Sequence, residues 1–157
     1  MPGFAFTTLI AAPVPAVFAA FIDFGNAPSR VKDIVRLEVL TSGPVGVGTK
    51  FKETRVMFGR EATETMELTA FEPNQLFELT AASCGAEFRT RFTFSPDGPG
   101  TRVGVEVQTA AKSFYAKLFR PLAYLMMGTM KSCIRRDIDQ IKASVEGGSG
   151  GVAPVTG

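Results

Sequence analysis

Three charged residues with strand spacing are the strongest candidates for chemistry in this sequence. Glu53 and Arg55 lie two residues apart in a strand-like run at 49–58, and Glu64 lies in the next such run, at 61–71. Side chains two residues apart point to the same face of a strand. A carboxylate held beside a guanidinium on an apolar face can have a shifted pKa and act as a general base. These three are therefore the candidate catalytic residues.

The turn between the two runs decides which of these side chains meet. A tight turn at Gly59-Arg60 would make the strands antiparallel neighbours and put Arg55 near Glu64, with Glu53 further along. A bulge or a slip of one residue would instead send Glu53 and Arg55 to solvent. If Glu53 and Arg55 do point inward, the alternative to a catalytic role is a structural ion pair.

The composition limits the remaining chemistry. The chain has no His, no Trp and only two Cys, at positions 84 and 133. Without His, a Ser-His-Asp or Cys-His catalytic group cannot form. Two distant Cys are too few for a zinc site, so we expect neither a metal nor a cofactor. Acid–base chemistry would have to use Asp, Glu, Lys, Tyr or Arg, and we therefore favour binding over catalysis.

The hydrophobic pattern predicts strands followed by one long helix. Alternation and turn residues predict strands at 4–10, 34–41, 49–58, 61–71, 75–82, 86–94 and 101–109. Apolar residues at helical spacing predict a short helix at 14–22, and residues 27–32 are consistent with a second short helical turn. A helix of about 30 residues is predicted from Ser113 to Val145, stopped by Gly147. Pro121 either kinks this helix or begins its main part.

This order of elements predicts an α+β fold of one domain. A curved antiparallel sheet of about seven strands has one apolar face, and the long C-terminal helix must cover it. A pocket is expected where the sheet curves away from that helix. The domain spans residues 1–146, and the Gly-rich stretch at 147–157 is expected to be a flexible tail.

Apolar, aromatic and methionine side chains on the inner face are the expected ligand contacts. Methionine is flexible and adapts to irregular ligands, and a Tyr hydroxyl can orient a polar group. The alternative is that these residues form ordinary core. The expected contacts are Phe51, Met57, Met66, Phe77, Phe88, Phe92, Tyr115, Leu122, Met126 and Met130.

The ordered set of short motifs resembles one known family. The matching motifs are Ile10-Ala11-Ala12-Pro13, Asn26-Ala27-Pro28, residues 43–49, Phe71-Glu72-Pro73, Gly100-Thr101-Arg102-Val103 and residues 137–142. Across residues 4–146 the chain resembles the START-like superfamily, specifically the polyketide cyclase/dehydrase and lipid-transport group called SRPBCC. The resemblance implies a helix-grip fold with a cavity for an apolar or amphipathic ligand. It does not imply a reaction, because fold alone does not decide function.

Three functions are consistent with this sequence. The first is binding of a hydrophobic small molecule, lipid or polyketide-like, between sheet and helix. The second is a cofactor-free cyclase or dehydratase that removes a proton next to a carbonyl, with Glu53 or Glu64 as base and Arg55 or a Tyr stabilising the enolate. The third is a module for a partner or a membrane surface, because residues 112–146 carry seven Lys or Arg against three Asp or Glu.

The expected partners and location follow from what the sequence lacks. No uncharged apolar run reaches the roughly 18 residues that a membrane-spanning helix needs. No RNA-binding signature or Gly-rich phosphate loop is present, so nucleic acid is not an expected partner. We expect a cytoplasmic protein, monomeric or homodimeric.

Overall fold

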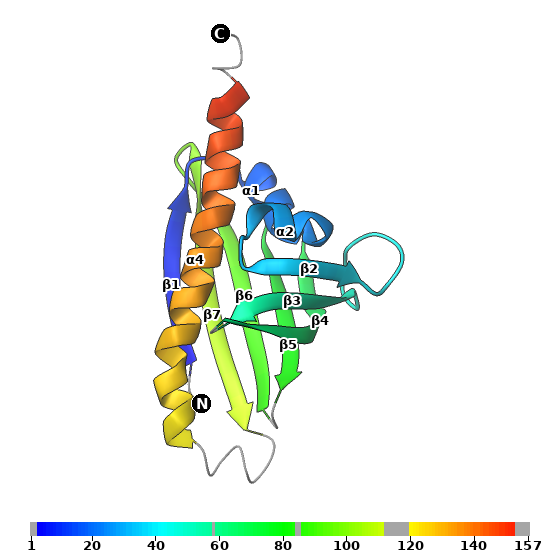
Figure 1. Ribbon diagram of the computed structural model, residues 1–157. Coiled ribbons are helices and arrows are strands. Elements are labelled where there is room, and N and C mark those ends of the chain that lie inside the picture. Colours follow the sequence, from blue (N-terminus) through cyan, green and yellow to red (C-terminus); the bar gives the residue numbers. More distant parts are fainter. Residues whose placement is uncertain (1–2, 58, 84–85, 112–119, 153–157) are drawn as a thin grey trace.

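The protein folds into one antiparallel sheet with short helices packed at one end and one long helix across its inner face (Figure 1). The computed structural model describes residues 3–57, 59–83, 86–111 and 120–152. The strands are β1 (Gly3–Ile10), β2 (Ile34–Val39), β3 (Lys50–Met57), β4 (Arg60–Glu72), β5 (Leu76–Ser83), β6 (Ala86–Asp97) and β7 (Gly100–Ala111). The helices are α1 (Val14–Ile22), the short 3₁₀ helix η1 (Phe24–Asn26), α2 (Ala27–Arg30) and α4 (Arg120–Val152).

The sheet has seven strands in the order β1-β7-β6-β5-β4-β3-β2, and each strand is antiparallel to its neighbours. The first two strands in the chain therefore lie at opposite edges. The segment containing α1, η1 and α2 makes the connection between these edges. This arrangement confirms the predicted α+β fold and its seven-stranded sheet.

The sheet bends strongly, and β2 and β3 run across the direction of β6 and β7 (Figure 1). A register shift lies between Leu68 and Ala70 in β4, and another between Ile34 and Arg36 in β2. Such irregularities bend a strand and increase its twist. They let β4 pair with β3 at one end and with β5 at the other while the sheet turns around α4.

An aromatic cluster fills the end of the sheet covered by α1 and η1. Phe18 of α1 packs edge-on against Phe94, with ring centroids 5.1 Å apart, and Phe24 stacks on Phe51 at 4.5 Å. Phe77 is 1% exposed and stacks on Phe92 at 4.7 Å. The predicted apolar face of α1 is confirmed, because its buried residues are Val17, Phe18 and Phe21.

Helix α4 lies across the inner face of the sheet, contacts β1, and ends beyond the strands (Figure 1). Its most buried described side chain is Ile138, at 2% exposure. The predicted end at Gly147 is wrong, because α4 continues to Val152. A Gly inside a helix costs only about 1 kcal/mol relative to Ala, so Gly147 weakens an established helix without ending it. Residues 113–119 of the predicted helix lie outside the described residues.

Candidate functional site

A buried cluster of opposite charges joins β3 to α4. The Nε of Arg55 donates a 2.8 Å hydrogen bond to Oε1 of Glu53, and its Nη2 donates a 2.8 Å bond to Oδ2 of Asp137. The exposed fractions of these side chains are 18% for Arg55, 10% for Glu53 and 17% for Asp137. One guanidinium on the sheet is therefore held between a carboxylate of its own strand and a carboxylate of the helix.

Strand alternation places the sheet half of this cluster. Phe51, Glu53 and Arg55 alternate with Lys52 and Thr54 along β3, and Phe51 is 1% exposed within the core. Because Arg55 shares the face of Phe51, it points toward α4 rather than toward solvent. Of the two placements that the sequence left open for Glu53 and Arg55, the structure shows the inward one.

The register of the β3–β4 hairpin differs from the predicted one. Strand β3 ends at Met57 and β4 begins at Arg60, so Arg55 lies opposite Ala62 rather than Glu64. The predicted turn was one residue too late, which displaced the pairing by two residues. Because side chains alternate with a period of two, this displacement changes the partners but leaves every side chain on its expected face.

The observed register puts two carboxylates directly opposite each other. Glu53 and Glu64 are cross-strand partners, and Glu64 is half-buried. Within the described part of the chain, Glu64 forms no hydrogen bond or ion pair, whereas Glu53 is neutralised by Arg55. Like charges directly opposite each other destabilise a sheet. Glu64 is thus an unpartnered acid on a largely apolar face.

Burial and neighbouring charges shift the pKa values of this cluster. Desolvation raises the pKa of Asp137, and the nearby charges of Glu53 and Asp33 raise it further, while Arg55 opposes the change. Desolvation alone would lower the pKa of Arg55, but Glu53 and Asp137 outweigh it and raise that pKa above its ordinary value. Arg55 therefore stays cationic, and Asp137 holds a proton more readily than an exposed aspartate.

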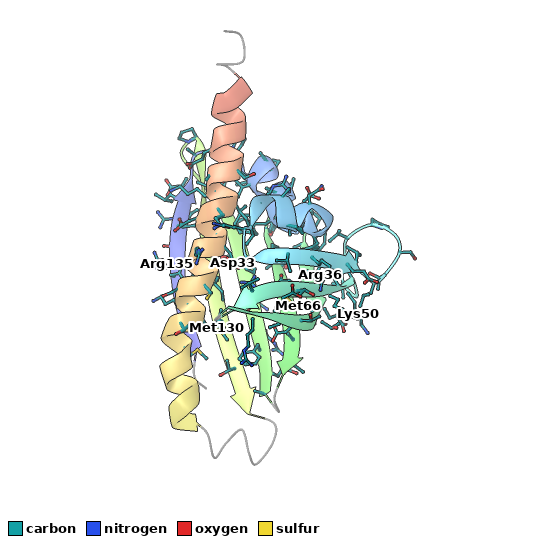
Figure 2. The ribbon with its side chains drawn as sticks, viewed as in Figure 1. Asp33, Arg36, Lys50, Met66, Met130 and Arg135 are labelled. Atoms are coloured by element: carbon teal, nitrogen blue, oxygen red, sulfur yellow. The ribbon has the colours of Figure 1, made fainter. Side chains whose placement is uncertain are left out.

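Polar contacts on several sides fix the position of α4 beside the cluster. Arg136 lies 3.5 Å from Asp33, just before β2, and Arg135 lies over the ring of Phe6 in β1, 4.6 Å from its centroid. Figure 2 shows Asp33 and Arg135 on opposite sides of the helix. The side chain of Gln140 accepts a 2.7 Å hydrogen bond from the backbone N–H of Lys32.

A further contact holds the C-terminal part of the same helix. The Glu146 carboxylate accepts a 2.7 Å hydrogen bond from the backbone N–H of Ala11, which follows β1. Together with the contacts of Arg135, Arg136 and Gln140, this bond fixes the rotation of α4 about its axis. That rotation is what directs Asp137 at Arg55.

The predicted ligand contacts are distributed over the inner face. Phe51 and Phe77 are fully buried in the aromatic cluster, while Phe88 and Phe92 are partly buried on β6. Met66 on β4 and Met130 on α4 are partly buried and pack against the core (Figure 2). Tyr115 and the side chains of Met57, Leu122 and Met126 lie outside the described residues. Ligand contact by these residues stays a prediction.

Asp137 is the member of the cluster that the search for chemistry in the sequence did not single out. It lies three residues after Ile134 and four before Ile141, which both pack against the core. An acid in the apolar stripe of a helix is unusual, because an unpaired buried charge is costly. That position was the available signal, but only the fold supplies Arg55 as the partner. Among the described residues, no group of three His, Cys, Asp or Glu is placed to hold a metal ion.

An antiparallel sheet wrapped around a long C-terminal helix is the START-like helix-grip fold. The sequence profile described as polyketide cyclase/dehydrase and lipid transport matches residues 1–146. The chain belongs to this family, also called SRPBCC, as the motifs indicated. A search of curated proteins finds no match.

Solved structures of low sequence identity share the fold. A START superfamily protein from Mycobacterium smegmatis is 16% identical, with a TM-score of 0.72 over 92% of this chain and 97% of that one. The Zhui aromatase/cyclase from Streptomyces sp. R1128 is 14% identical, with a TM-score of 0.76 over 93% and 94%. A point mutant of norcoclaurine synthase from Thalictrum flavum is 15% identical, with a TM-score of 0.69 over 92% and 93%. At these identities the likeness establishes the fold alone. In the described part of the chain, no helix is long and apolar enough to cross a membrane.

Proposed function

We propose that this protein binds a hydrophobic or amphipathic small molecule, lipid or polyketide-like, between the sheet and α4. The observation that carries the proposal is the inner face itself, where apolar side chains from both layers pack against the core and stay only partly buried. Met66 and Leu79 come from the sheet, and Met130 and Ile134 from the helix. Ligand sites of this kind are mostly apolar with a few fixed polar groups. Membership of a family described by lipid transport supports the same proposal.

Native mass spectrometry of the purified protein tests this function. A co-purified or added apolar molecule should remain bound at one copy per chain, and a hydrophobic fluorophore should be displaced by it. Met130→Glu, which puts a charge on the inner face of α4, should weaken binding about tenfold or more. Arg102→Glu is a matched control, because Arg102 pairs with Asp97 at the exposed outer side of the sheet. The proposal fails if no apolar molecule binds saturably.

A second candidate function is that of a cofactor-free cyclase or dehydratase. The contact of Arg55 with two carboxylates favours it, because a fixed cation beside a carboxylate base can stabilise an enolate. The fold shared with an aromatase/cyclase is consistent with this chemistry. In this hypothesis Glu53, Glu64 or Asp137 removes the proton next to a carbonyl, and Arg55 binds the developing oxyanion.

Conservative amide variants separate the two functions. Glu53→Gln and Glu64→Gln should keep ligand binding but abolish turnover if the protein is an enzyme with one of these bases. Turnover of a polyketide-like β-ketone would be followed by absorbance and mass spectrometry, with binding measured in parallel. Unchanged turnover in both variants would exclude these two residues as the base and leave Asp137→Asn to be tested.

A further inference from the structure

Among the described residues, the charged cluster at Arg55 has a negative balance. Glu53 and Asp137 contact the guanidinium of Arg55, and Glu64 adds a third carboxylate opposite Glu53 on the next strand. The nearby Asp33 is already paired with Arg136 and adds no net charge of its own. Whether or not Asp137 carries a proton, the carboxylates outnumber the guanidinium. This imbalance lies within a largely apolar face, where charges are less screened than in water.

The unused hydrogen-bonding atoms of the cluster are mainly acceptors. Glu53 and Asp137 each direct one oxygen at Arg55, which leaves the other oxygen of each carboxylate without a described bond to it. Both oxygens of Glu64 lack a hydrogen bond to any described residue. Arg55 keeps free N–H groups, but its positive charge is already offset by two carboxylates. A polar group that enters here therefore meets acceptors and a negative potential.

Glu64 is the member best placed to act on a ligand. It is half-buried and has no partner among the described residues, and it shares a strand face with Met66, which packs against the core from two residues further along β4. Arg55 and Asp137 are bonded to each other, which fixes the orientation of both side chains. A ligand lying on the apolar side chains near Met66 would bring its polar end next to the Glu64 carboxylate.

We propose that the bound molecule ends in a hydrogen-bond donor without negative charge, an amine or a hydroxyl group, and that Glu64 selects it. This inference rests on the proposed ligand-binding function and names the chemistry of the ligand's polar end. A carboxylate or phosphate end would be buried beside like charges, which costs free energy in a poorly screened site. An ammonium end would gain from the same charges, and a hydroxyl end would gain a hydrogen bond without the repulsion.

Three probes with the same alkyl chain test the selectivity. Decylamine, decanol and decanoate would displace a hydrophobic fluorophore from the full chain at neutral pH and below their micelle concentrations. We expect decylamine to bind most tightly, decanol next and decanoate least, with about tenfold or more between the amine and the carboxylate. Equal affinities, or tightest binding by decanoate, would overturn the inference and leave the binding function intact. If none of the probes binds, both the inference and the binding function fail.

A matched pair of variants assigns the selectivity to Glu64. Glu64→Gln should reduce the preference for decylamine over decanoate about tenfold, mainly because decanoate should bind more tightly once the Glu64 charge is removed. Glu67→Gln is the control, because Glu67 lies on the same strand but pairs with Lys50 at an exposed position. Thermal unfolding of both variants verifies that they fold. An unchanged preference in folded Glu64→Gln, or an equal loss in Glu67→Gln, would show that Glu64 does not select the ligand.

Discussion

Two regions hold the helices of this protein onto its sheet, and they do so by different physical means. Helix α1 and η1 are held by phenylalanine rings, with Phe18 and Phe24 in direct ring contact with sheet aromatics such as Phe77. Helix α4 is held near its middle by Arg55 and Asp137, a bonded pair of charges. The first region is held by buried apolar area and by the fit of the rings, whereas the second is held by charge and hydrogen-bond geometry.

The difference teaches which region is suited to a ligand. Burial of aromatic rings stabilises a fold strongly and leaves no polar group to satisfy. A buried ion pair adds little net stability, because the cost of desolvating the charges offsets their attraction. The charged contact therefore has no strong structural justification of its own. Together with Glu64, the carboxylates of this contact put negative charge on the inner face, which suits the recognition of a polar group that we propose.

The largest effect is expected in the aromatic region. Phe77→Ala should lower the free energy of unfolding by about 4 kcal/mol, because it removes a fully buried ring and leaves a cavity. Phe77→Leu keeps most of the volume and should cost about 1 kcal/mol. Urea denaturation would measure both. A cost below about 1 kcal/mol for Phe77→Ala would mean that the aromatic cluster is not the main stabilising region.

The next largest effect is expected when the charged contact is broken on one side. Arg55→Met leaves Glu53 and Asp137 buried without their partner and should cost about 3 kcal/mol at neutral pH. Burial already raises the pKa of Asp137, and without Arg55 nothing opposes that rise. The penalty is therefore complete at high pH and disappears as the pH falls below the unfolded values near 4.

Denaturation curves at neutral and acidic pH would test this dependence on Arg55. Arg102→Met serves as the control, since its ion pair with Asp97 is exposed, and it should cost less than about 1 kcal/mol at either pH. A penalty for Arg55→Met that stays constant with pH would contradict the charged origin of the effect.

Replacing the whole cluster should lower the free energy of unfolding less than removing Arg55 alone. A triple variant with Glu53→Met, Arg55→Met and Asp137→Leu removes every charge of the bonded group and should lie within about 1 kcal/mol of the wild type. The measurement is again the free energy of unfolding, now combined with the alkyl probes. If the triple variant is as unstable as Arg55→Met alone, the cluster is a structural requirement rather than a device for recognition.

The smallest effect is expected at an exposed charged contact near the aromatic region. Hydrogen bonds from Arg30 and Asn26 lower the pKa of Asp23. Asp23→Ala should cost about 0.5 kcal/mol at neutral pH, because the pair is partly exposed. Since the folded pKa is the lower one, this contribution is present above the unfolded pKa and is lost as the pH falls through the folded value. Thermal unfolding at neutral and strongly acidic pH would detect this loss.

Much of the fold could be predicted because local patterns encode it. Alternation predicted a strand at 86–94, and β6 forms there with Phe92 and Phe94 on its more buried face and Arg89 and Arg91 on its exposed face. The end of α4 was harder to predict, because Gly147 disfavours a helix without ending one that has already formed. The β3–β4 partners were also predicted wrongly, because one residue of error in a turn displaces the pairing by two.

The sequence by itself determined which elements form and which face of each is apolar, because both follow from the periods of strand and helix. It also determined that Glu53 and Arg55 share a face, since they lie two residues apart. Only the tertiary structure decided that Arg55 meets Asp137, which is 82 residues away. That contact depends on the bend of the sheet and on the rotation of α4 about its axis. Both are set by packing between distant segments, which no local pattern records.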